Sequence, residues 1–419
     1  MPEVTTEQSQ LTAYGQGVLE RLRVIDDYDD VNFVLRSGDF EITSPLPEFG
    51  GRYWNRLLGG TLAGLDGDQH YQRRRLESVL FRRDTLSHYE ADLVRPAVLA
   101  KLESLRAQRD PDGRVRADLV RLLKLTLFRL MARLTGLDGV EDERSAERME
   151  ELFDAIDQGI RIRFTLADPE AVTRRAMEAR DRLVQEFFAP SWRRRERLLE
   201  TDAAGLPNDL ISLILSHPAH FAEWDPELAI REVTLFIAGS VGTTVNHTCH
   251  TVEELCRWLE QNPDEEAKLT DPGFLARAFE EELRGWSVLP TMLRRARCAI
   301  TLPSGLAVRA GEVVSLSVQE ASHAAFGPGA GDFDPERDPP AGVKRYMLAF
   351  GHGTHTCIGK PLVLGDGRSG PGARLGTVKT ILLELMSAGV RADPDRPCTF
   401  RDDNARGTHL TFPVIFTRL

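Results

Sequence analysis

Apolar residues recur with helical spacing along most of the chain between residues 85 and 290. The longest such stretch begins at Asp225, which can cap a helix, and Pro226, which suits a first helical position. No further proline occurs before Pro263. The pattern therefore predicts one helix of about 36 residues, or roughly 54 Å.

Strand-like patterns are short and lie mainly in the C-terminal third, at Ile300–Leu302, Leu306–Val308, Val313–Val318 and Leu410–Phe416. The first two flank a Pro-Ser-Gly turn at residues 303–305. No internal repeat and no Pro/Ser-rich linker divides the chain. We therefore predict a mainly α fold with small β-sheets.

One glycine-rich segment interrupts the helical pattern near the C-terminus. Residues 363–372 contain four glycines and a proline, which cannot continue a helix. Helical patterning returns at Ala373–Lys379. We interpret Val363–Gly372 as an inserted surface loop, which is either inert or shapes the docking of a partner.

Composition narrows the class of protein. The 419 residues are 42% apolar and 28% charged, and 53 basic against 64 acidic residues give a net charge of −11. This charge disfavours nucleic acid and anionic lipid as partners. The N-terminal residues lack the order of a signal peptide, and no stretch approaches the roughly 18 uninterrupted apolar residues of a membrane span. We expect a cytoplasmic protein with no membrane partner.

The five cysteines are too few and too scattered for a disulfide framework. Cys249, Cys256, Cys298 and Cys398 are expected to be small buried apolar residues. Cys357 differs because it lies in a loop, Phe350–Gly359, that holds three glycines and two histidines. Such glycines permit tight turns whose backbone N–H groups converge on the sulfur and stabilise a thiolate. A thiolate is the axial ligand that helps an iron porphyrin to cleave the O–O bond.

Three other interpretations of this loop are weaker. A glycine turn around a buried cysteine would leave the combined spacing of Phe, Gly, His and Cys in this loop to chance. A zinc site made of His352, His355 and Cys357 lacks a fourth ligand in paired spacing. A phosphate-binding loop would end in Gly-Lys-Ser/Thr, which is absent.

The loop resembles the haem-binding signature of the cytochrome P-450 family, F-G-x-G-x-H-x-C-x-G, at every specified position. The resemblance implies a cytochrome P-450 fold in a single large domain, residues 29–419, after an N-terminal extension, residues 1–28. It implies haem b as cofactor, with Cys357 as the iron ligand and Phe350 in the haem-binding loop. His70 and Arg74 resemble the family's H-x-x-x-R element, which contacts the haem propionates. Arg295, next to Arg294, and His355 are further propionate candidates.

Two more elements of the family are recognisable. Glu281 and Arg284, three apart on a helix, resemble its E-x-x-R ion pair, and Phe333–Arg337 resembles its connecting segment. In the predicted long helix, residues 238–244 resemble the oxygen-activation element, so Thr243 is the expected oxygen activator. Gly242 stands where the family usually has Asp or Glu, so protons would come through water, from Asn246 or His247, or from the substrate. The alternative for Thr243 is a hydroxyl that only bonds to the carbonyl one turn earlier.

By resemblance, the chain is a soluble bacterial-type haem-thiolate monooxygenase that uses O2 and electrons from a ferredoxin and ferredoxin reductase. The expected substrate is a small to medium organic molecule, and the expected pocket is apolar. It would be lined from segments 45–65, 152–167 and 288–293, which contain Tyr53, Trp54, Phe153, Ile156, Ile160, Phe164, Leu289 and Met292.

Arginines in and near these segments allow two interpretations. Arg161 and Arg163 either meet an acidic substituent or lie on the surface, and the groups at 73–75, 82–83 and 193–197 are expected to be solvated. Arg75 is a candidate for docking the acidic ferredoxin. Because Gly242 replaces the acid, peroxide use or oxidative coupling is an alternative activity. A haem-binding sensor without catalysis is the alternative from another class.

Overall fold

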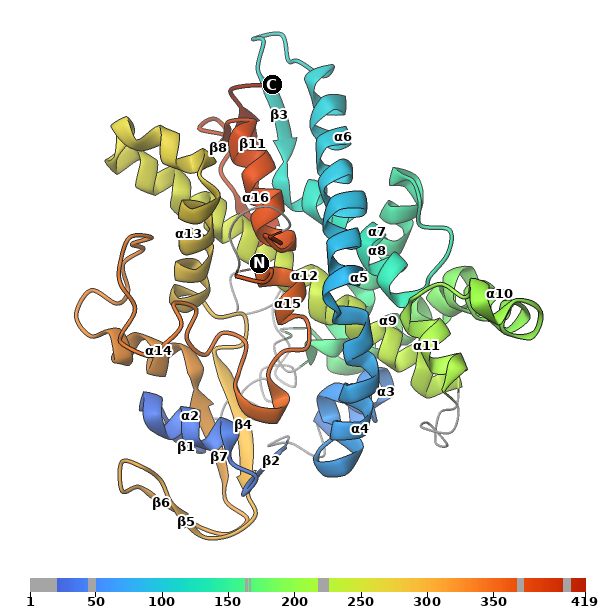
Figure 1. The fold of residues 1–419 in the computed structure, drawn as a ribbon, viewed down its shortest axis with the longest axis vertical. Coiled ribbons are helices and arrows are strands. Elements are labelled where there is room, and N and C mark those ends of the chain that lie inside the picture. Colours follow the sequence, from blue (N-terminus) through green and yellow to red (C-terminus); the bar gives the residue numbers. More distant parts are fainter. Residues whose placement is uncertain are drawn as a thin grey trace.

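The fold is described from a computed structural model that covers residues 21–43, 50–162, 165, 167–217, 226–367, 373–401 and 408–419, with side chains omitted at 50–53. It is mainly helical, with four small sheets at its edges (Figure 1). The helices are α2 (Tyr28–Arg36), α3 (Gly50–Leu58), α4 (Gly67–Glu77), α5 (Arg83–His88), α6 (Arg95–Arg106), α7 (Leu119–Thr135), α8 (Glu143–Ile160), α9 (Pro169–Leu183), α10 (Ala189–Thr201), α11 (Leu210–Ser216), α12 (Pro226–Gln261), α13 (Pro272–Gly285), α14 (Val318–Phe326), α15 (Lys360–Leu364) and α16 (Thr377–Ser387). The predicted mainly α fold is confirmed.

The longest helix, α12, has the predicted start and length, running for 36 residues from Pro226 to Gln261. The predicted cap, Asp225, lies outside the described residues. Helix α12 packs against α7 and α13. Within the described part of the chain it is the one helix long and apolar enough to cross a membrane, yet 61% of its most apolar window is buried in the protein. A core helix of a globular protein passes the same test.

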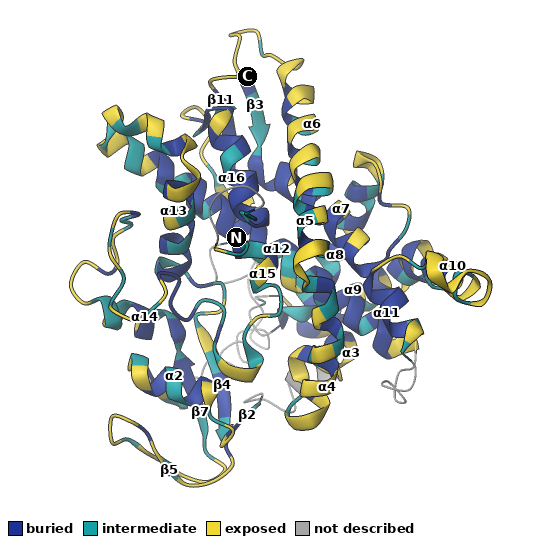
Figure 2. Ribbon diagram, viewed as in Figure 1, coloured by how far each residue is buried: buried dark blue, intermediate teal, exposed yellow. Residues whose placement is uncertain are grey.

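The largest sheet has four strands in the order β1 (Arg23–Ile25), β7 (Val313–Ser317), β4 (Thr291–Ala296) and β2 (Phe40–Ile42). Strand β1 is parallel to β7, and the other pairs are antiparallel. Because β1 lies within residues 1–28, the folded body begins before the predicted boundary at residue 29. The apolar side chains of this sheet, with those of α2 and α14, form a small core that is separate from the main helical one. In Figure 2, α16 is largely buried, whereas α10 is exposed along much of its length.

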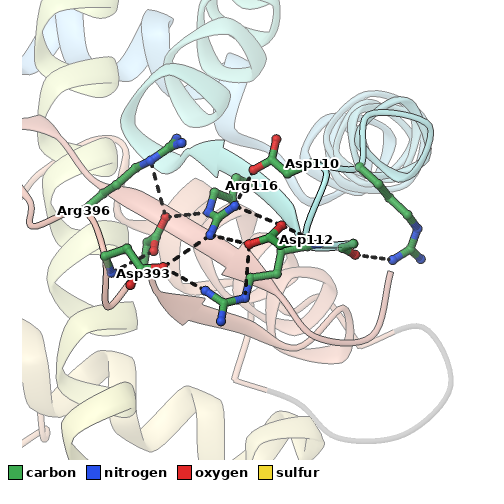
Figure 3. Close-up of polar contacts among 9 residues, drawn as sticks. Asp110, Asp112, Arg116, Asp393 and Arg396 are labelled. Carbon is green, nitrogen blue, oxygen red and sulfur yellow. Dashed lines mark hydrogen bonds and ion pairs between the residues drawn. The ribbon is translucent and has the colours of Figure 1, made fainter.

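The other sheets are smaller. Strands β3 (Val115–Asp118), β11 (Pro413–Phe416) and β8 (Val390–Ala392) form one, while β5 (Ile300–Thr301) pairs with β6 (Ala307–Val308) and β9 (Thr399–Phe400) with β10 (His409–Thr411). The predicted strand over Leu410–Phe416 is therefore two strands that belong to different sheets. Strand β3 has no strong sequence signal, and pairing with β11 and an ionic network hold it in place. In that network Arg116 meets Asp110 at 2.5 Å, Asp112 at 2.9 Å and Asp393 at 3.1 Å (Figure 3).

The glycine-rich segment does interrupt a helix, but the helix resumes later than predicted. Helix α15 ends at Leu364, and α16 begins at Thr377 instead of Ala373. Gly376 has φ +89°, and a Cβ atom there would overlap the Val363 carbonyl oxygen. Residues 373–376 are therefore part of the segment that connects α15 and α16, not of a helix. Glu90 holds the end of this segment by accepting the N–H groups of Leu375 and Gly376 at 3.0 and 2.9 Å.

Candidate haem-thiolate site

The cysteine loop is a compact turn between Phe350 and α15. The Cys357 N–H donates to the Phe350 carbonyl at 2.8 Å, and the Gly351 N–H donates to the Leu348 carbonyl at 2.8 Å. Residues 353–355 form a single 3-10 turn inside it. The two hydrogen bonds fix the backbone before the sulfur, and the Lys360 N–H, which donates to the Cys357 carbonyl at 3.3 Å, fixes the backbone after it.

Two of the loop glycines have the left-handed conformation expected for such a turn. Gly351 has φ +64° and Gly353 has φ +70°. A Cβ atom on Gly353 would lie 2.5 Å from the Leu35 carbonyl oxygen, so the missing side chain lets the loop rest on the end of α2. Gly359 differs, with φ −77°, and a Cβ atom there would make an ordinary contact with the Cys357 sulfur at 3.7 Å.

The Cys357 side chain is exposed, whereas Cys249 and Cys256 are buried as predicted. The pKa of the Cys357 thiol is raised, because loss of water around the sulfur outweighs the lowering by the backbone N–H groups of Gly359 and Lys360 and by the charge of Arg74. An accessible sulfur with N–H donors and a guanidinium nearby fits a metal-bound thiolate, because a bound cation supplies the stabilisation that burial removes. The prediction for Cys298 is wrong, since it lies exposed in the bend after β4, and Cys398 is half-buried.

Helix α4 carries His70 and Arg74 to the same region. His70 is 4% exposed and its ring stacks obliquely on that of His355, with centroids 4.1 Å apart. Burial, His355 and Arg74 together lower the pKa of His70 to about 4, so it is neutral at pH 7. Among the described residues, the Arg74 guanidinium has no hydrogen bond or ion pair, and this half-buried charge fits an external carboxylate such as a haem propionate.

Helix α4 is held in place from its inner face. Arg73 is buried, not solvated as predicted, because its guanidinium lies 3.0 Å from the Glu232 carboxylate on α12. Glu232 also accepts the Leu62 N–H at 3.1 Å. Burial raises the pKa of Glu232 to about 7, and burial together with Glu232 raises that of Glu77 well above its usual value. Arg195, also expected to be solvated, is buried between Asp209 and Asp138.

Strand β4 presents Arg294, rather than Arg295, to the site. Arg295 points to the opposite side, where it lies 3.2 Å from the Thr43 hydroxyl and 3.7 Å from Glu41. Arg294 is buried, interacts electrostatically with His355 and Asp66, and donates to its neighbour's carbonyl, that of Leu293, at 2.8 Å. Successive residues of a strand face opposite sides, so a shift of one position reverses the direction of the side chain. His355 is within 3.3 Å of Asp66.

Helix α12 is accessible to solvent midway along its length. Gly239 is exposed, and Ala238, Ser240, Gly242 and Thr243 are half-buried, although most of the helix on either side is buried. The Thr243 hydroxyl donates to the Gly239 carbonyl at 2.8 Å and to the Ser240 carbonyl at 3.1 Å. This is the alternative arrangement predicted for Thr243, and it leaves the oxygen lone pairs free to accept a hydrogen bond from a neighbouring donor.

The space beside Gly242 is taken by an arginine from α8. A Cβ atom at position 242 would lie 2.5 Å from Nη2 of Arg161, whose Nε is 2.9 Å from the Asp157 carboxylate. No sequence signal predicts this contact, because it joins residues 81 positions apart. Asn246 and His247, the proposed proton sources, are engaged elsewhere: Asn246 with the Gly242 carbonyl and His409 N–H, and His247 with Glu282 at 3.0 Å.

The expected pocket lining is only partly accessible. Phe153 and Ile156 are buried in the main core, Leu289 is 41% exposed, and Trp54, Ile160 and Met292 are partly buried. Phe164, Arg163 and the side chain of Tyr53 lie outside the described residues. Helix α8 also carries a polar contact in this region, since Arg401 pairs with Asp154 at 2.7 Å, one turn from Asp157.

Glu281 and Arg284 form the predicted ion pair on α13. Their oxygens and nitrogens approach to 2.6 Å, and the side chains are 0% and 1% exposed. Arg337, from the predicted connecting segment, approaches Glu281 at 3.4 Å, and Arg345 approaches it at 4.0 Å. One carboxylate thus joins α13 to the segment that leads into the cysteine loop.

A second polar cluster, not anticipated from the sequence, lies on the C-terminal half of α12. Ligand atoms of His250, Glu253 and His409 lie within 4.8 Å of one another. Burial and His409 lower the pKa of His250 to about 3, so its ring is neutral at pH 7. The cluster joins α12 to β10, and the i, i+3 spacing of His250 and Glu253 is the only local signal for it.

Comparison with known proteins agrees with the geometry. The family model described as Cytochrome P450 matches residues 20–363, and so ends where the glycine-rich segment begins. Cytochrome P450-SU2 of Streptomyces griseolus is 30% identical over 349 residues, covering 81% of this chain and 76% of the relative. Erythromycin C-12 hydroxylase of Saccharopolyspora erythraea is 29% identical over 311 residues, or 72% and 69% of the two chains.

Solved structures share the fold at lower identity. P450BioI in complex with an acyl carrier protein that carries hexadec-9Z-enoic acid is similar with a TM-score of 0.68 at 18% identity, covering 98% of this chain and 100% of that one. A mutant of P450 EryK in complex with erythromycin B has a TM-score of 0.64 at 20% identity, covering 98% and 97%. At these identities the similarity establishes the fold alone.

Proposed function

This chain belongs to the cytochrome P450 family and is a cytochrome P450 monooxygenase, and on that premise we propose that it hydroxylates or dealkylates a small to medium organic molecule. We further propose that it uses haem b, dioxygen and electrons from a ferredoxin and ferredoxin reductase, in the cytoplasm. Residues from β1 to the C-terminus form the proposed single domain.

The observation that carries the proposal is the environment of Cys357. Its accessible sulfur lies beside the N–H groups of Gly359 and Lys360 and within the field of Arg74. Haem bound through this sulfur supplies the activation of dioxygen. The N–H donors hold negative charge on the sulfur, and Phe350 fixes the loop by accepting the Cys357 N–H.

Four side chains around the loop share the binding of the haem propionates. We assign Arg74 and Arg294 as the cationic partners, and His70 and His355 as neutral hydrogen-bonding partners. The assignment of Arg294 replaces Arg295, whose guanidinium is directed towards Thr43 and Glu41. Arg294→Gln should therefore lower haem retention more than Arg295→Gln does, as measured by the ratio of Soret to protein absorbance.

Thr243 is the proposed proton relay on α12. Its hydroxyl donates to the Gly239 carbonyl within the helix. To act as a relay it would rotate away from this carbonyl, so that Oγ1 accepts a hydrogen bond from water while its O–H donates towards the reacting centre. Without an acid at position 242, this relay has one fewer member than in most of the family. That difference favours a second candidate function, in which peroxide replaces dioxygen and the external proton supply matters less.

Turnover assays separate the two functions. We expect product with dioxygen, NAD(P)H, ferredoxin and ferredoxin reductase, and in Thr243→Ala we expect electrons to be consumed without matching product. Product with hydrogen peroxide alone, insensitive to Thr243→Ala, would establish the peroxide-dependent function. A protein that loads haem normally and oxidises no bound ligand in either assay would instead be a haem-binding sensor.

The docking of ferredoxin is tested on the exposed end of α4. Arg75 is exposed and lies next to Arg74 in the sequence. We propose that it contacts an acidic ferredoxin, so Arg75→Glu should lower reductase-supported turnover and leave peroxide-supported turnover unchanged. Arg193→Glu, an exposed arginine on α10, is the control. Equal rates for both variants and the parent protein would reject the assignment.

A further inference from the structure

Gly242, which stands where the family usually has an acid, lies against the guanidinium of Arg161. Nη2 of Arg161 lies where a side chain at position 242 would begin, 2.5 Å from an ideal Cβ position, and Cζ lies 3.7 Å away. Any larger residue at 242 would displace this arginine. The glycine therefore allows a positive charge to rest against α12, one residue before Thr243.

Arg161 has unused hydrogen-bonding capacity. It follows the last residue of α8, and its Nε lies 2.9 Å from the Asp157 carboxylate. Within the described residues, no hydrogen bond or ion pair uses either terminal nitrogen of Arg161, and the side chain is 17% exposed. A guanidinium carries five N–H donors in a planar fork, so one edge remains for a second acceptor.

Another arginine of the same protein shows what a fully used guanidinium looks like. Arg195 is 4% exposed and bonds to two carboxylates, that of Asp209 at 2.7 Å and that of Asp138 at 2.9 Å. Among the described residues, Arg161 has one carboxylate partner, Asp157, and no second one. The acid nearest along α8, Asp154, is already bonded to Arg401 at 2.7 Å and to Gln158 at 3.2 Å.

Nη2 of Arg161 lies beside the solvent-accessible part of α12. The helix is exposed at Gly239 and half-buried at Ser240, Gly242 and Thr243, so a small molecule can reach this surface. A partly desolvated guanidinium is best satisfied by a carboxylate, which can accept two parallel N–H bonds. Asp157 balances the resting charge of Arg161 and fixes its orientation, which prepares the fork for such a ligand.

We propose that Arg161 binds a carboxylate of the substrate and that Gly242 makes room for it, so that the enzyme selects organic acids and holds them beside Thr243. This inference rests on the proposed function and names the substrate class of the same site. Asp157 is a positioning residue, since it acts through Arg161.

The test is a ligand titration of the haem-loaded protein, followed by the spin-state change of its absorption spectrum. The probes are aliphatic, aromatic and terpenoid carboxylic acids, each paired with its methyl ester. We expect some acids to bind at least about tenfold more tightly than their esters, the range expected for a charge-assisted bidentate contact. Arg161→Gln should weaken the binding of these acids by about tenfold to hundredfold and leave the esters unchanged.

Two further variants keep the test interpretable. Gly242→Asp offers Arg161 a carboxylate within the protein and should also abolish the preference for acids, even if Arg161→Gln folds poorly. Arg148→Gln, on the same helix but paired with Glu186 on the surface, should retain it. Retention of the preference in Arg161→Gln, or a wild-type protein that binds esters as tightly as acids or binds no acid at millimolar concentration, would overturn the proposal. A normal carbon monoxide spectrum in every variant shows that such a failure concerns Arg161 and not the haem-thiolate function.

Discussion

Replacing Glu281 by glutamine should destabilise the protein strongly, because three arginines depend on that carboxylate. Glu281 is 0% exposed and lies 2.6 Å from Arg284, 3.4 Å from Arg337 and 4.0 Å from Arg345. Glutamine has nearly the same volume and can still accept a hydrogen bond, but it carries no charge. Arg284 also donates to the Ala330 and Asp332 carbonyls, so it stays fixed in the interior when its counter-charge is lost.

The expected cost follows from the burial of the pair. Removing one partner of a buried ion pair leaves the other charge without compensation and costs about 3–5 kcal/mol. The control is Glu151→Gln, which breaks the Arg148–Glu151 pair at the same i, i+3 spacing but with 37% and 67% exposure. An exposed pair of this kind contributes about 0–1 kcal/mol.

Urea unfolding followed by far-UV circular dichroism measures both variants against the parent protein. The Glu281→Gln protein should also lose haem at lower urea, because the Glu281 contacts join α13 to the segment that leads into the cysteine loop. A loss of less than about 1 kcal/mol, equal to that of Glu151→Gln, would show that the three arginines do not depend on this carboxylate.

Two further predictions concern the loop and the support of α4. Gly353→Ala should reduce haem content and lower the melting temperature more than Gly305→Ala does. Both glycines have positive φ, but only at Gly353 would a Cβ atom meet backbone, 2.5 Å from the Leu35 carbonyl oxygen. Equal losses would show that this close approach is unimportant. Burial raises the pKa values of Glu77 and Glu232, so the folded protein retains a proton that the unfolded chain releases. The free energy of unfolding should therefore fall as the pH rises, by up to about 1.4 kcal/mol per pH unit between about pH 5 and pH 7. Glu77→Gln should flatten this dependence in urea titrations at several pH values, and an unchanged slope would contradict the retention of a proton by the Glu77 and Glu232 carboxyl groups in the folded protein.

The sequence was most informative where the chemistry is local. The loop around Cys357 could be predicted because its glycines, its cysteine and its N–H donors lie within eleven consecutive residues, Phe350–Lys360. The length of α12 followed from two prolines. The Glu281–Arg284 pair was expected from the family resemblance, and its three-residue spacing on a helix permits the contact. In each case the interacting groups are neighbours along one element.

Sequence reasoning falls short where tertiary contacts decide. The pattern singles out Arg295 as a propionate partner, which stays a prediction, whereas the register of β4 with β2 and β7 shows that Arg294 and Arg295 point to opposite sides. Arg73 is buried because Glu232, 159 positions away, compensates its charge. The contact of Arg161 with Gly242 has no local signal beyond the absence of an acid at position 242.

The most direct test of the iron-ligand assignment is the carbon monoxide difference spectrum of the reduced, haem-loaded protein and of its Cys357→Ser variant, with Cys298→Ser as a matched exposed-cysteine control. We predict the long-wavelength Soret band of thiolate-ligated haem in the parent protein and in Cys298→Ser, and its loss in Cys357→Ser. A Cys357→Ser protein that keeps this band, or a parent protein that never shows it, would contradict the assignment of the Cys357 sulfur as the iron ligand.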